Sequence, residues 1–330
     1  MNKKARYWVT ADDGGVRCGL CPHRCRLAEG ATGRCGIRRA SGGVLYACGY
    51  GKISSAAIDP IEKKPLYHFH PGSRIFSIGG WGCNFACEFC QNWTISQRVE
   101  SGAGDVDPSG IVADAGSAGS IGVAYTYNEP LVGIEFVQDC AQAVRKAGLK
   151  NVLVTNGYIE RGPASDLLPL VDALNIDIKS MNEEFYRMHC GGRLAPVLDF
   201  AKQAVEAGCH VEITNLLIPG LNSSDDEVHA LAEWIAGNLG PGTPLHISAY
   251  RPQYKLSIKS TPYSLMESAW KVSRAALSYV YLGNTTGEGQ NTVCPGCSAT
   301  LVTRRGYMTE LRGTIDGSCA DCGRRVDIAP

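Results

Sequence analysis

Neither sign of charge prevails in this 330-residue sequence, which has 32 lysines and arginines and 32 aspartates and glutamates. The balance argues against a nucleic-acid or anionic membrane partner, because such proteins generally carry a basic excess. The chain also has no run of about 20 apolar residues, so we predict no membrane-spanning helix. The N-terminus, MNKKARYWVTADDGG, has no apolar signal core, and we therefore expect a cytoplasmic protein.

A disulfide framework is not expected either, although the chain has 15 cysteines. Cytosolic thiols stay reduced, so metal binding explains so many cysteines better. Eleven of them fall into three groups: Cys18, Cys21, Cys25 and Cys35; Cys83, Cys87 and Cys90; and Cys294, Cys297, Cys319 and Cys322. The groups predict an N-terminal cysteine-rich segment (1–70), a central domain (71–285) and a C-terminal domain (286–330). The other four cysteines are isolated and are interpreted as buried apolar residues.

The central domain alternates short apolar runs with amphipathic stretches. We predict strands at 74–80, 120–127, 150–157, 173–179, 210–218, 244–250 and 279–284, and helices at 131–148, 195–208 and 224–238. Strands joined by crossover helices form a parallel sheet or barrel. Polar residues just past the strand ends then gather at one edge, where chemistry usually takes place.

The stretch WGCNFACEFCQNW places Cys83, Cys87 and Cys90 in a C-x3-C-x2-C pattern with no fourth cysteine nearby. A structural zinc ion requires four ligands, whereas an iron-sulfur cube held by three thiolates keeps one iron open for a substrate or cofactor. The spacing alone also allows a zinc site that a distant histidine or cysteine completes.

These residues resemble the radical S-adenosylmethionine (SAM) enzymes, over most of residues 60–285. The motifs TYNEP, VTNGY, NIDIKS, IPGLN and YLGN, together with CPHRCRL and GRCGIR, are most similar to the AmmeMemoRadiSam system radical SAM enzymes, relatives of the glycyl-radical-enzyme activases. The resemblance implies a partial (β/α)6 TIM-like barrel and a [4Fe-4S] cluster. It further implies reductive cleavage of SAM to methionine and a 5'-deoxyadenosyl radical under anaerobic conditions. Reduced ferredoxin or flavodoxin would supply the electron, and Memo-like and AMMECR-like proteins are the family's habitual companions.

The resemblance also implies which polar residues at the strand ends contact SAM. Those residues are Thr126, Asn128, Glu129, Asn156, Asp177, Glu212, Asn215 and His246, and Asp177 and Lys179 would also face the substrate as catalytic residues. The sequence YTYNEP departs from the Gly-Gly-Glu common in this branch. Other interpretations are a helix cap at Glu129, a structural ion pair between Asp177 and Lys179, and a core histidine at His246.

The spacing of the cysteines predicts the type of metal site for one of the two flanking groups but not for the other. CPGC and CADC are paired knuckles, typical of a zinc-ribbon or rubredoxin-like four-thiolate site at Cys294, Cys297, Cys319 and Cys322, with zinc favoured over iron only by its prevalence. For Cys18, Cys21, Cys25 and Cys35, spacing leaves zinc, a second iron-sulfur cluster and no metal equally open.

We therefore predict a radical SAM enzyme that abstracts hydrogen from an unidentified substrate. One alternative target is a glycine of a partner enzyme, on which the chain would install a radical as an activase. Another is a small molecule. A hypothesis of a different class is a non-enzymatic zinc-binding interaction scaffold, which would ignore SAM.

Overall fold

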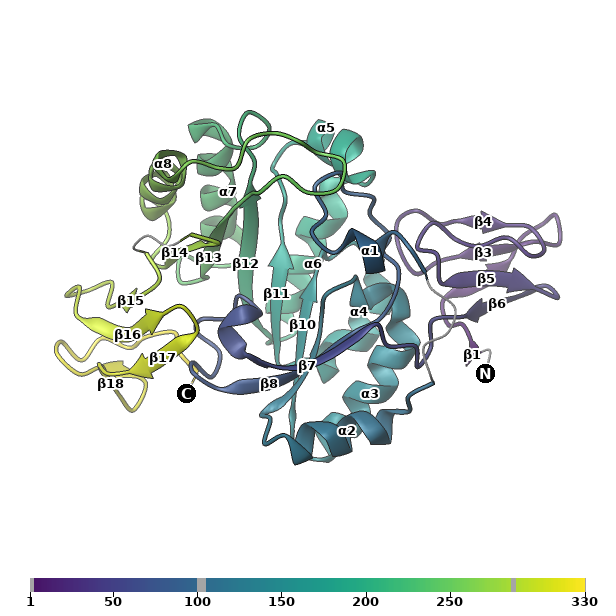
Figure 1. Ribbon diagram of the computed structural model, residues 1–330, viewed down its shortest axis with the longest axis horizontal. Helices are drawn as coiled ribbons and strands as arrows, with labels where there is room; N and C mark the ends of the chain where they lie inside the picture. The colour runs from purple at the N-terminus through teal and green to yellow at the C-terminus, as the bar shows by residue number, and fades with distance from the viewer. Residues whose placement is uncertain (1–2, 100–104, 286–288, 330) are drawn as a thin grey trace.

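The computed structural model describes residues 3–99, 105–285 and 289–329. Its centre is an eight-stranded sheet in the order β14-β13-β12-β11-β10-β9-β8-β7 (Figure 1). The parallel strands are β8 (Arg74–Gly79), β9 (Gly122–Tyr125), β10 (Lys150–Thr155), β11 (Ala173–Asp177), β12 (His210–Leu217), β13 (Leu245–Ala249) and β14 (Val280–Gly283). The seven predicted strands are thus confirmed. The sheet is open, with β7 and β14 at its edges, so the fold is a partial barrel.

Strand β7 (Ser55–Pro60) is the one antiparallel member of this sheet and pairs with β8 along its whole length. These residues fall within the predicted N-terminal segment (1–70). Their low apolar content hides the strand, because β7 is an edge strand with one partner and needs no continuous apolar run.

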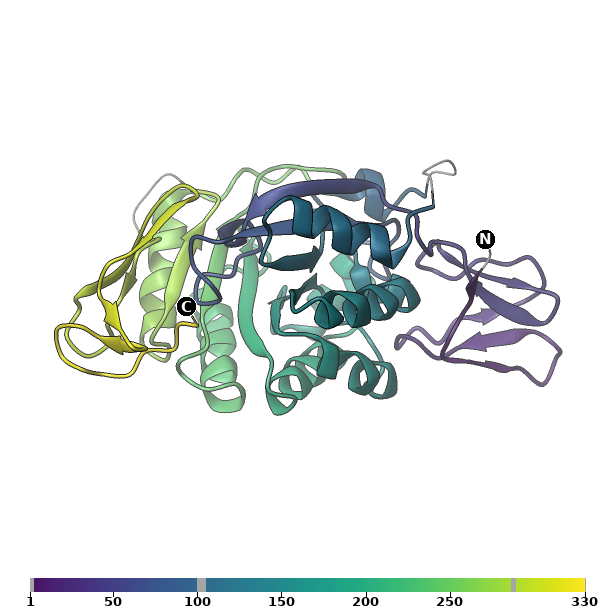
Figure 2. The same cartoon turned by 90° about the horizontal axis from the view of Figure 1, so that it is seen from below.

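Helices follow the parallel strands and cover one side of the curved sheet, where the teal and green ribbons lie in Figure 2. They are α1 (Trp93–Ser96), α2 (Pro108–Ser117), α3 (Ile134–Lys146), α4 (Arg161–Leu167), α5 (Glu183–Phe185), α6 (Leu194–Glu206), α7 (Asp225–Asn238) and α8 (Tyr263–Arg274). Short 3₁₀ turns occupy Ile61–Lys63, Pro130–Gly133 and Leu168–Leu170, and a π-helical turn occupies Tyr186–Cys190. The predicted helix at 131–148 is therefore a 3₁₀ turn followed by α3.

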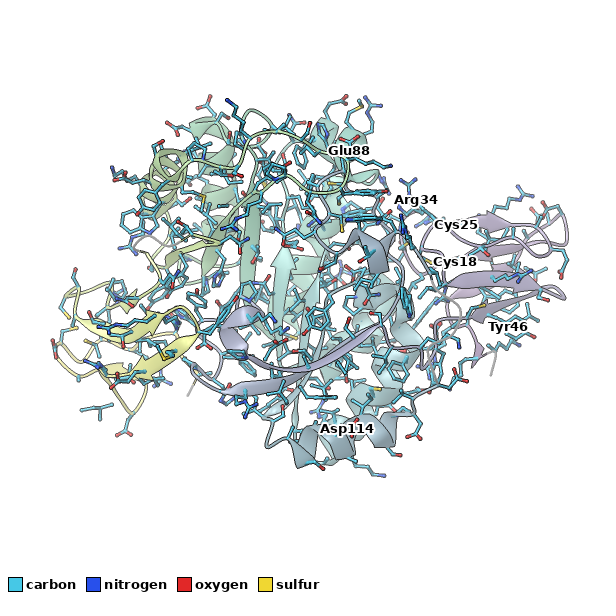
Figure 3. The ribbon with its side chains drawn as sticks, viewed as in Figure 1. Cys18, Cys25, Arg34, Tyr46, Glu88 and Asp114 are labelled. Atoms are coloured by element: carbon cyan, nitrogen blue, oxygen red, sulfur yellow. The ribbon has the colours of Figure 1, made fainter. Side chains whose placement is uncertain are left out.

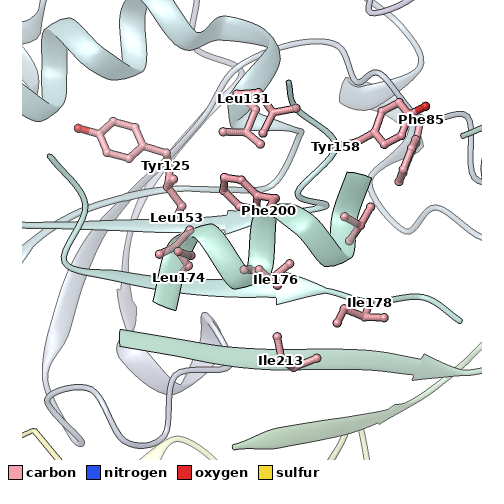
Figure 4. Close-up of a cluster of buried hydrophobic side chains, with 14 of the residues drawn as sticks. Phe85, Tyr125, Leu131, Leu153, Tyr158, Leu174, Ile176, Ile178, Phe200 and Ile213 are labelled. Atoms are coloured by element: carbon pink, nitrogen blue, oxygen red, sulfur yellow. The ribbon is translucent and has the colours of Figure 1, made fainter. Parts of the chain in front are cut away.

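The core lies between the sheet and its helices. Figure 4 shows Leu153, Leu174, Ile176 and Ile213 of the central strands beside Phe200 of α6. All five side chains are fully buried. Because these strands are buried on both faces, apolar residues predominate along them, which is why the sequence marks them as apolar runs.

Two small β units flank the central sheet on opposite sides (Figure 1). The N-terminal unit contains β1 (Lys3–Lys4), β2 (Trp8–Thr10), β3 (Val16–Cys18), β4 (Arg26–Leu27), β5 (Arg38–Ser41) and β6 (Val44–Ala47). The C-terminal unit contains β15 (Thr292–Val293), β16 (Thr300–Arg305), β17 (Met308–Leu311), β18 (Thr314–Ile315) and β19 (Ser318–Cys319).

Buried polar contacts attach both units to the central domain. In the N-terminal unit, the Arg38 guanidinium donates two hydrogen bonds to the Glu135 carboxylate of α3, at 2.9 and 3.0 Å. In the C-terminal unit, the Arg304 guanidinium donates to the Tyr67 carbonyl at 2.6 Å, and the His68 ring bonds to the Asp327 carbonyl at 2.7 Å. Within the described part of the chain, no helix has the length and apolarity to cross a membrane.

Candidate active site

The three-cysteine loop leaves the carboxyl end of β8 and runs through turns rather than regular structure. The Ala86 and Glu88 amides donate to the carbonyls of Cys190 and His189, at 2.8 and 3.1 Å. The Asn84 side chain donates to the Tyr158 carbonyl at 2.7 Å. These bonds come from loops that follow other strands, so the completed sheet fixes the shape of the cysteine loop.

The three thiols of this loop have different surroundings. The Phe85 amide donates to Cys83 Sγ at 3.3 Å, and Cys90 Sγ lies 3.2 Å from the Ser96 hydroxyl. Burial raises the pKa of the Cys83 thiol well above its ordinary value. The pKa of Cys87 is lowered, chiefly by a hydrogen bond from the Cys190 thiol. A buried thiolate such as that of Cys83 needs a metal to compensate its lost hydration.

A cavity of about 590 Å³ opens at the carboxyl ends of the parallel strands, beside these thiols. A volume of this size is in the range of ordinary small-molecule sites. The predicted residues in its wall are Cys83, Cys87, Cys90, Thr126, Asn128, Glu129, Asn156, Asp177 and Lys179. The fold thus brings together residues that are up to 96 positions apart in the sequence, from Cys83 to Lys179.

Glu129 is the most deeply buried carboxylate of this wall, with 3% of its surface exposed. It accepts hydrogen bonds from the Thr155 hydroxyl at 2.6 Å and from the Asn156 and Leu131 amides at 2.8 and 3.0 Å. Burial raises its pKa to about 7, against the opposing effect of these bonds. The carboxylate is therefore held in one orientation and would gain from a cationic ligand. The contact with Leu131 also makes it a cap of the 3₁₀ turn, so the helix-cap interpretation of Glu129 is confirmed, while its contact with SAM stays a prediction.

Asp177 and Lys179 form an ion pair of 3.1 Å at the end of β11. Lys179 is the more buried partner, with 14% of its side chain exposed against 34% for Asp177. Although burial acts against the ammonium, Asp177 and the thiols of Cys87 and Cys190 raise the pKa of Lys179 well above its ordinary value. The wall thus places a lasting positive charge beside the cysteine loop.

Asn128 and Asn156 position the backbone around the thiols. The Asn128 amide group donates to the carbonyls of Trp81 and Gly82, at 3.0 and 3.1 Å, and its oxygen accepts from the Gly80 amide at 2.8 Å. The Asn156 amide group donates to the Asn84 side chain at 2.9 Å and lies 3.7 Å from Cys83 Sγ. Thr126 lies beside them in the wall.

Three of the predicted SAM contacts do not line the cavity: Glu212, Asn215 and His246. Glu212 is fully buried and accepts from the His246 ring at 2.6 Å, from the His210 ring at 2.9 Å and from two amides of the loop at residues 67–68. The Asn215 amide group donates to the Ile178 carbonyl at 2.9 Å and clamps the end of β11. Glu212 and His246 lie too near the amino ends of their strands to reach the cavity.

The residues that reach the cavity from these strands are Thr214, Leu216 and Ser248. Each lies two or four positions beyond Glu212 or His246 on the same strand face, about 7 Å further along for every two residues. Thr214 Oγ1 is buried and has no hydrogen-bond partner among the described residues. The alternation along VEITNLL was the signal for Thr214, but the depth at which the cavity begins was not readable from it.

Tyr307 of the C-terminal unit also lines the cavity. It belongs to the turn between β16 and β17 and keeps 58% of its surface exposed. Sequence reasoning missed it because no pattern within the C-terminal segment indicates which part of the central domain it faces.

The four C-terminal cysteines form a compact group. Their Sγ atoms all lie within 4.8 Å of one another, and Cys294–Cys322 and Cys297–Cys319 are each 3.6 Å apart. Four thiolates at about 2.3 Å from one zinc ion would be about 3.8 Å apart, so the group has the dimensions of a mononuclear site. It is the only group of that kind in the described residues.

The four N-terminal cysteines line a small cavity of their own, separate from the large one. Cys18 and Cys35 are buried, and Cys21 and Cys25 are half-buried. The ring of His23, in the same wall, donates through Nε2 to the Asn84 carbonyl at 2.8 Å. That ring nitrogen is therefore occupied.

The residues of the large cavity fit an iron-sulfur cluster with SAM. Three soft thiol donors without a fourth in the wall leave a coordination position open, and the carboxylate of Glu129 and the unpartnered hydroxyl of Thr214 lie within the same cavity. A parallel sheet with such a site at its carboxyl end defines a metal-binding α/β enzyme.

Comparison with known proteins identifies the family of this chain. Residues 78–235 match the model of the Radical SAM superfamily. An uncharacterized protein of Methanocaldococcus jannaschii is 43% identical, over 99% of both chains. Pyruvate formate-lyase 1-activating enzyme of Escherichia coli is 30% identical over 50% of this chain and 69% of that enzyme.

A solved radical SAM methyltransferase from Sphaerobacter thermophilus shares the fold, with a TM-score of 0.53 at 16% identity, over 66% of this chain and 68% of that one. The chain belongs to the radical SAM superfamily and is an enzyme of that class. Membership implies an iron-sulfur cluster and SAM as its cofactors.

Proposed function

We propose that Cys83, Cys87 and Cys90 hold a [4Fe-4S] cluster whose fourth iron takes the amino and carboxylate groups of SAM. When bound, these groups supply a 5'-deoxyadenosyl radical, formed as one electron cleaves SAM with release of methionine. The observation that carries the proposal is the opening of three thiols, with no fourth in the wall, onto a cavity with fixed charges.

The surrounding residues have distinct roles in this proposal. The Glu129 carboxylate accepts a hydrogen bond from the SAM amino group, because it is already aligned by Thr155 and Asn156. Asn128 holds the turn that leads into the cysteine loop. Asp177 and Lys179 face the substrate side of the cavity, where their charges orient polar groups.

The test is anaerobic reconstitution with iron and sulfide, followed by reduction, addition of SAM and measurement of 5'-deoxyadenosine. We expect product from the wild type and none from a Cys83/Cys87/Cys90→Ala variant. Cys209→Ala is the matched control, because Cys209 lies outside the cavity wall. Equal product from the triple variant would overturn the proposal, and so would a wild type that binds only zinc and makes no product.

For the target we favour the glycine of a partner enzyme, so that the chain acts as an activase. The supporting observation is Tyr307, which lines the cavity with 58% of its surface exposed, next to Met308 at the start of β17, which is 75% exposed. Large exposed apolar side chains beside an active site are typical of a docking surface. A partner protein that acquires a SAM-dependent EPR doublet would support this target, and a small product formed without any partner would contradict it.

We further propose zinc for the compact thiol group of the C-terminal unit, and reduced ferredoxin or flavodoxin as the electron donor. The motifs of the AmmeMemoRadiSam system enzymes make Memo-like and AMMECR-like proteins candidates for the partner. Addition of each purified candidate to the reduced enzyme with SAM, with the EPR doublet as readout, tests them individually.

A further inference from the structure

We propose that Cys18, Cys21, Cys25 and Cys35 hold a second iron-sulfur cluster, which passes single electrons to the cluster at Cys83, Cys87 and Cys90. The four thiols line one cavity at the side of the N-terminal unit that faces the central domain. Figure 3 places Cys18, Cys25 and Arg34 along this junction. The second cluster stands independently of the proposed function, whereas its role as an electron relay rests on it.

The spacing of the thiols favours a cluster over a single metal ion. In the described residues only the C-terminal thiols have all their sulfurs within 4.8 Å. The N-terminal thiols are more widely spaced, as are those of Cys83, Cys87 and Cys90. Wide spacing suits a polynuclear cluster, because each thiolate binds a different iron, whereas thiolates on one zinc ion are about 3.8 Å apart.

The lining of the cavity points in the same direction. A Cβ placed on Gly33 would lie 3.9 Å from the Sγ atoms of both Cys25 and Cys35, so the glycine backbone lies close to both sulfurs.

A buried donor in the same wall lacks a partner. Arg38 has 2% of its surface exposed, and its terminal nitrogens bond to Glu135 and to the Arg6 carbonyl. Its Nε has no hydrogen-bond partner among the described residues, and Arg38 lines the cavity of the four thiols. An anionic cluster there would supply the missing acceptor.

One layer of backbone separates the two cysteine groups. A Cβ on Gly82, next to Cys83, would lie 2.2 Å from the Cys35 carbonyl oxygen. Asn84, on the other side of Cys83, accepts from the His23 ring through its carbonyl and lines the N-terminal cavity. Cys21 and Cys25 are half-buried and give the N-terminal site a side toward solvent. The N-terminal site therefore has one side toward solvent and another against the cysteine loop of the catalytic site.

The electron balance of the relay is simple. A reduced flavodoxin or ferredoxin loses one electron to the N-terminal cluster, which returns to its oxidised state as that electron moves to the central cluster. Each SAM that is cleaved consumes one electron, so one donor molecule is oxidised by one electron in each event.

The first test uses the Cys83/Cys87/Cys90→Ala variant, which removes the central ligands. After anaerobic reconstitution we expect it to retain about half of the wild-type iron and acid-labile sulfide, with the Mössbauer signal of a cluster, since both sites hold cubes of similar size. Adding Cys18→Ala and Cys35→Ala should abolish both. Cys48→Ala in the same background is the control, because Cys48 lies outside the wall of the N-terminal cavity. Sulfide-free protein, or zinc in place of iron in the triple variant, would overturn the second cluster.

The iron content of the wild type tests the second cluster without relying on variants that could fail to fold. Two clusters predict roughly eight irons per chain and one cluster roughly four. For the relay, stopped-flow mixing of the Cys18/Cys35→Ala variant with reduced flavodoxin should show reduction of the central cluster slowed at least about tenfold. Unchanged rates would overturn the relay and leave the second cluster in place. Because iron and sulfide are counted without SAM, failure of the radical chemistry would be seen separately.

Discussion

The Glu129 carboxylate accepts hydrogen bonds from the Asn156 amide at 2.8 Å while it lies in the wall of the large cavity. This bond joins the ends of two neighbouring strands, β9 and β10, and aligns the carboxylate without neutralising it. Burial nevertheless raises its pKa to about 7. The proton on this group is therefore exchanged close to neutral pH.

SAM affinity should depend on the protonation of Glu129. The SAM amino group donates to the ionised carboxylate, so raising the pH from about 5.5 to 7.5 should tighten binding roughly 25-fold. Calorimetric titration of the reconstituted enzyme with SAM measures this. Glu129→Gln should bind more weakly and lose the pH dependence, and a variant that kept the wild-type pH profile would contradict the role.

The same group makes the ligand-free protein less stable at higher pH. A folded pKa above the unfolded value of 4.5 means that Glu129 contributes stability below that value and loses it as the pH rises through about 7. Denaturant unfolding between pH 5 and 8 should show this loss in the wild type. Glu129→Gln should lose less stability over the same interval.

On strand β12, Glu212 has a structural role, whereas Thr214 reaches the cavity where SAM is proposed to bind. Glu212 is fully buried, and although burial opposes its charge, the bonds and charges of His210 and His246 hold its pKa well below the ordinary range. Glu212→Gln should cost about 3–5 kcal/mol of unfolding free energy at pH 7, because it breaks a buried ionic network. The stability from Glu212 is present above pH 4.5 and is lost as the pH falls toward the folded pKa.

Thr214→Val should have the opposite profile, with near-native stability and SAM binding weakened by about 1 kcal/mol, the contribution of one hydrogen bond. Denaturant unfolding and SAM titration of both variants give the comparison. Equal loss of SAM affinity in a folded Glu212→Gln variant would restore Glu212 to the binding site.

Gly82→Ala should disturb the junction between the N-terminal unit and the cysteine loop. Gly82 has a φ of +82°, and an added Cβ would collide with the Cys35 carbonyl. We expect a loss of about 2 kcal/mol or more, together with lower iron content after reconstitution. Gly116→Ala in α2 is the control, because nothing lies within 4 Å of its Cβ position, and alanine there should add about 0.5–1 kcal/mol. Equal behaviour of the two variants would show that the junction tolerates a side chain.

Removal of the C-terminal metal should release that unit while the central domain stays folded. Its apolar cluster has only six buried residues, two of which are Cys294 and Cys319, so the proposed zinc ion would supply much of its stability. Chelation, or Cys297→Ser with Cys322→Ser, should remove one zinc per chain by elemental analysis and make the segment at 289–329 sensitive to protease. A protease-resistant C-terminal unit without metal would contradict this dependence.

Much of the fold follows from local sequence. The seven parallel strands are readable because strands buried on both faces are continuous apolar runs. Edge strand β7 is not, since one pairing partner demands little apolar surface. For the same reason the sequence pattern does not join β7 to the central sheet, although the strand pairs with β8.

For the site, the sequence shows which residues lie near the strand ends, but not which of them are far enough along the strand to reach the cavity. His246 and Ser248 lie on one face of β13, yet only Ser248 reaches the cavity. The difference is about 7 Å along the strand, and it depends on how far the loop at residues 67–68 rises into the open barrel to meet Glu212. The alternation of residues shows which face of the strand a side chain lies on. The packing of a distant loop determines where along the strand the cavity begins.

The sequence by itself determined the chemistry available to this protein: three thiols in one short loop, a four-thiolate pair of knuckles, and polar residues after apolar strands. Those features are local, because ligand spacing and strand pattern span only a few residues. Only the tertiary structure decided which groups meet. In it, the Glu129 carboxylate accepts a hydrogen bond from the Asn156 amide, and the Cys35 carbonyl lies next to Gly82. Glu212 lies below the cavity and does not line it. Such contacts join residues far apart in the chain, and their distances depend on how whole elements pack.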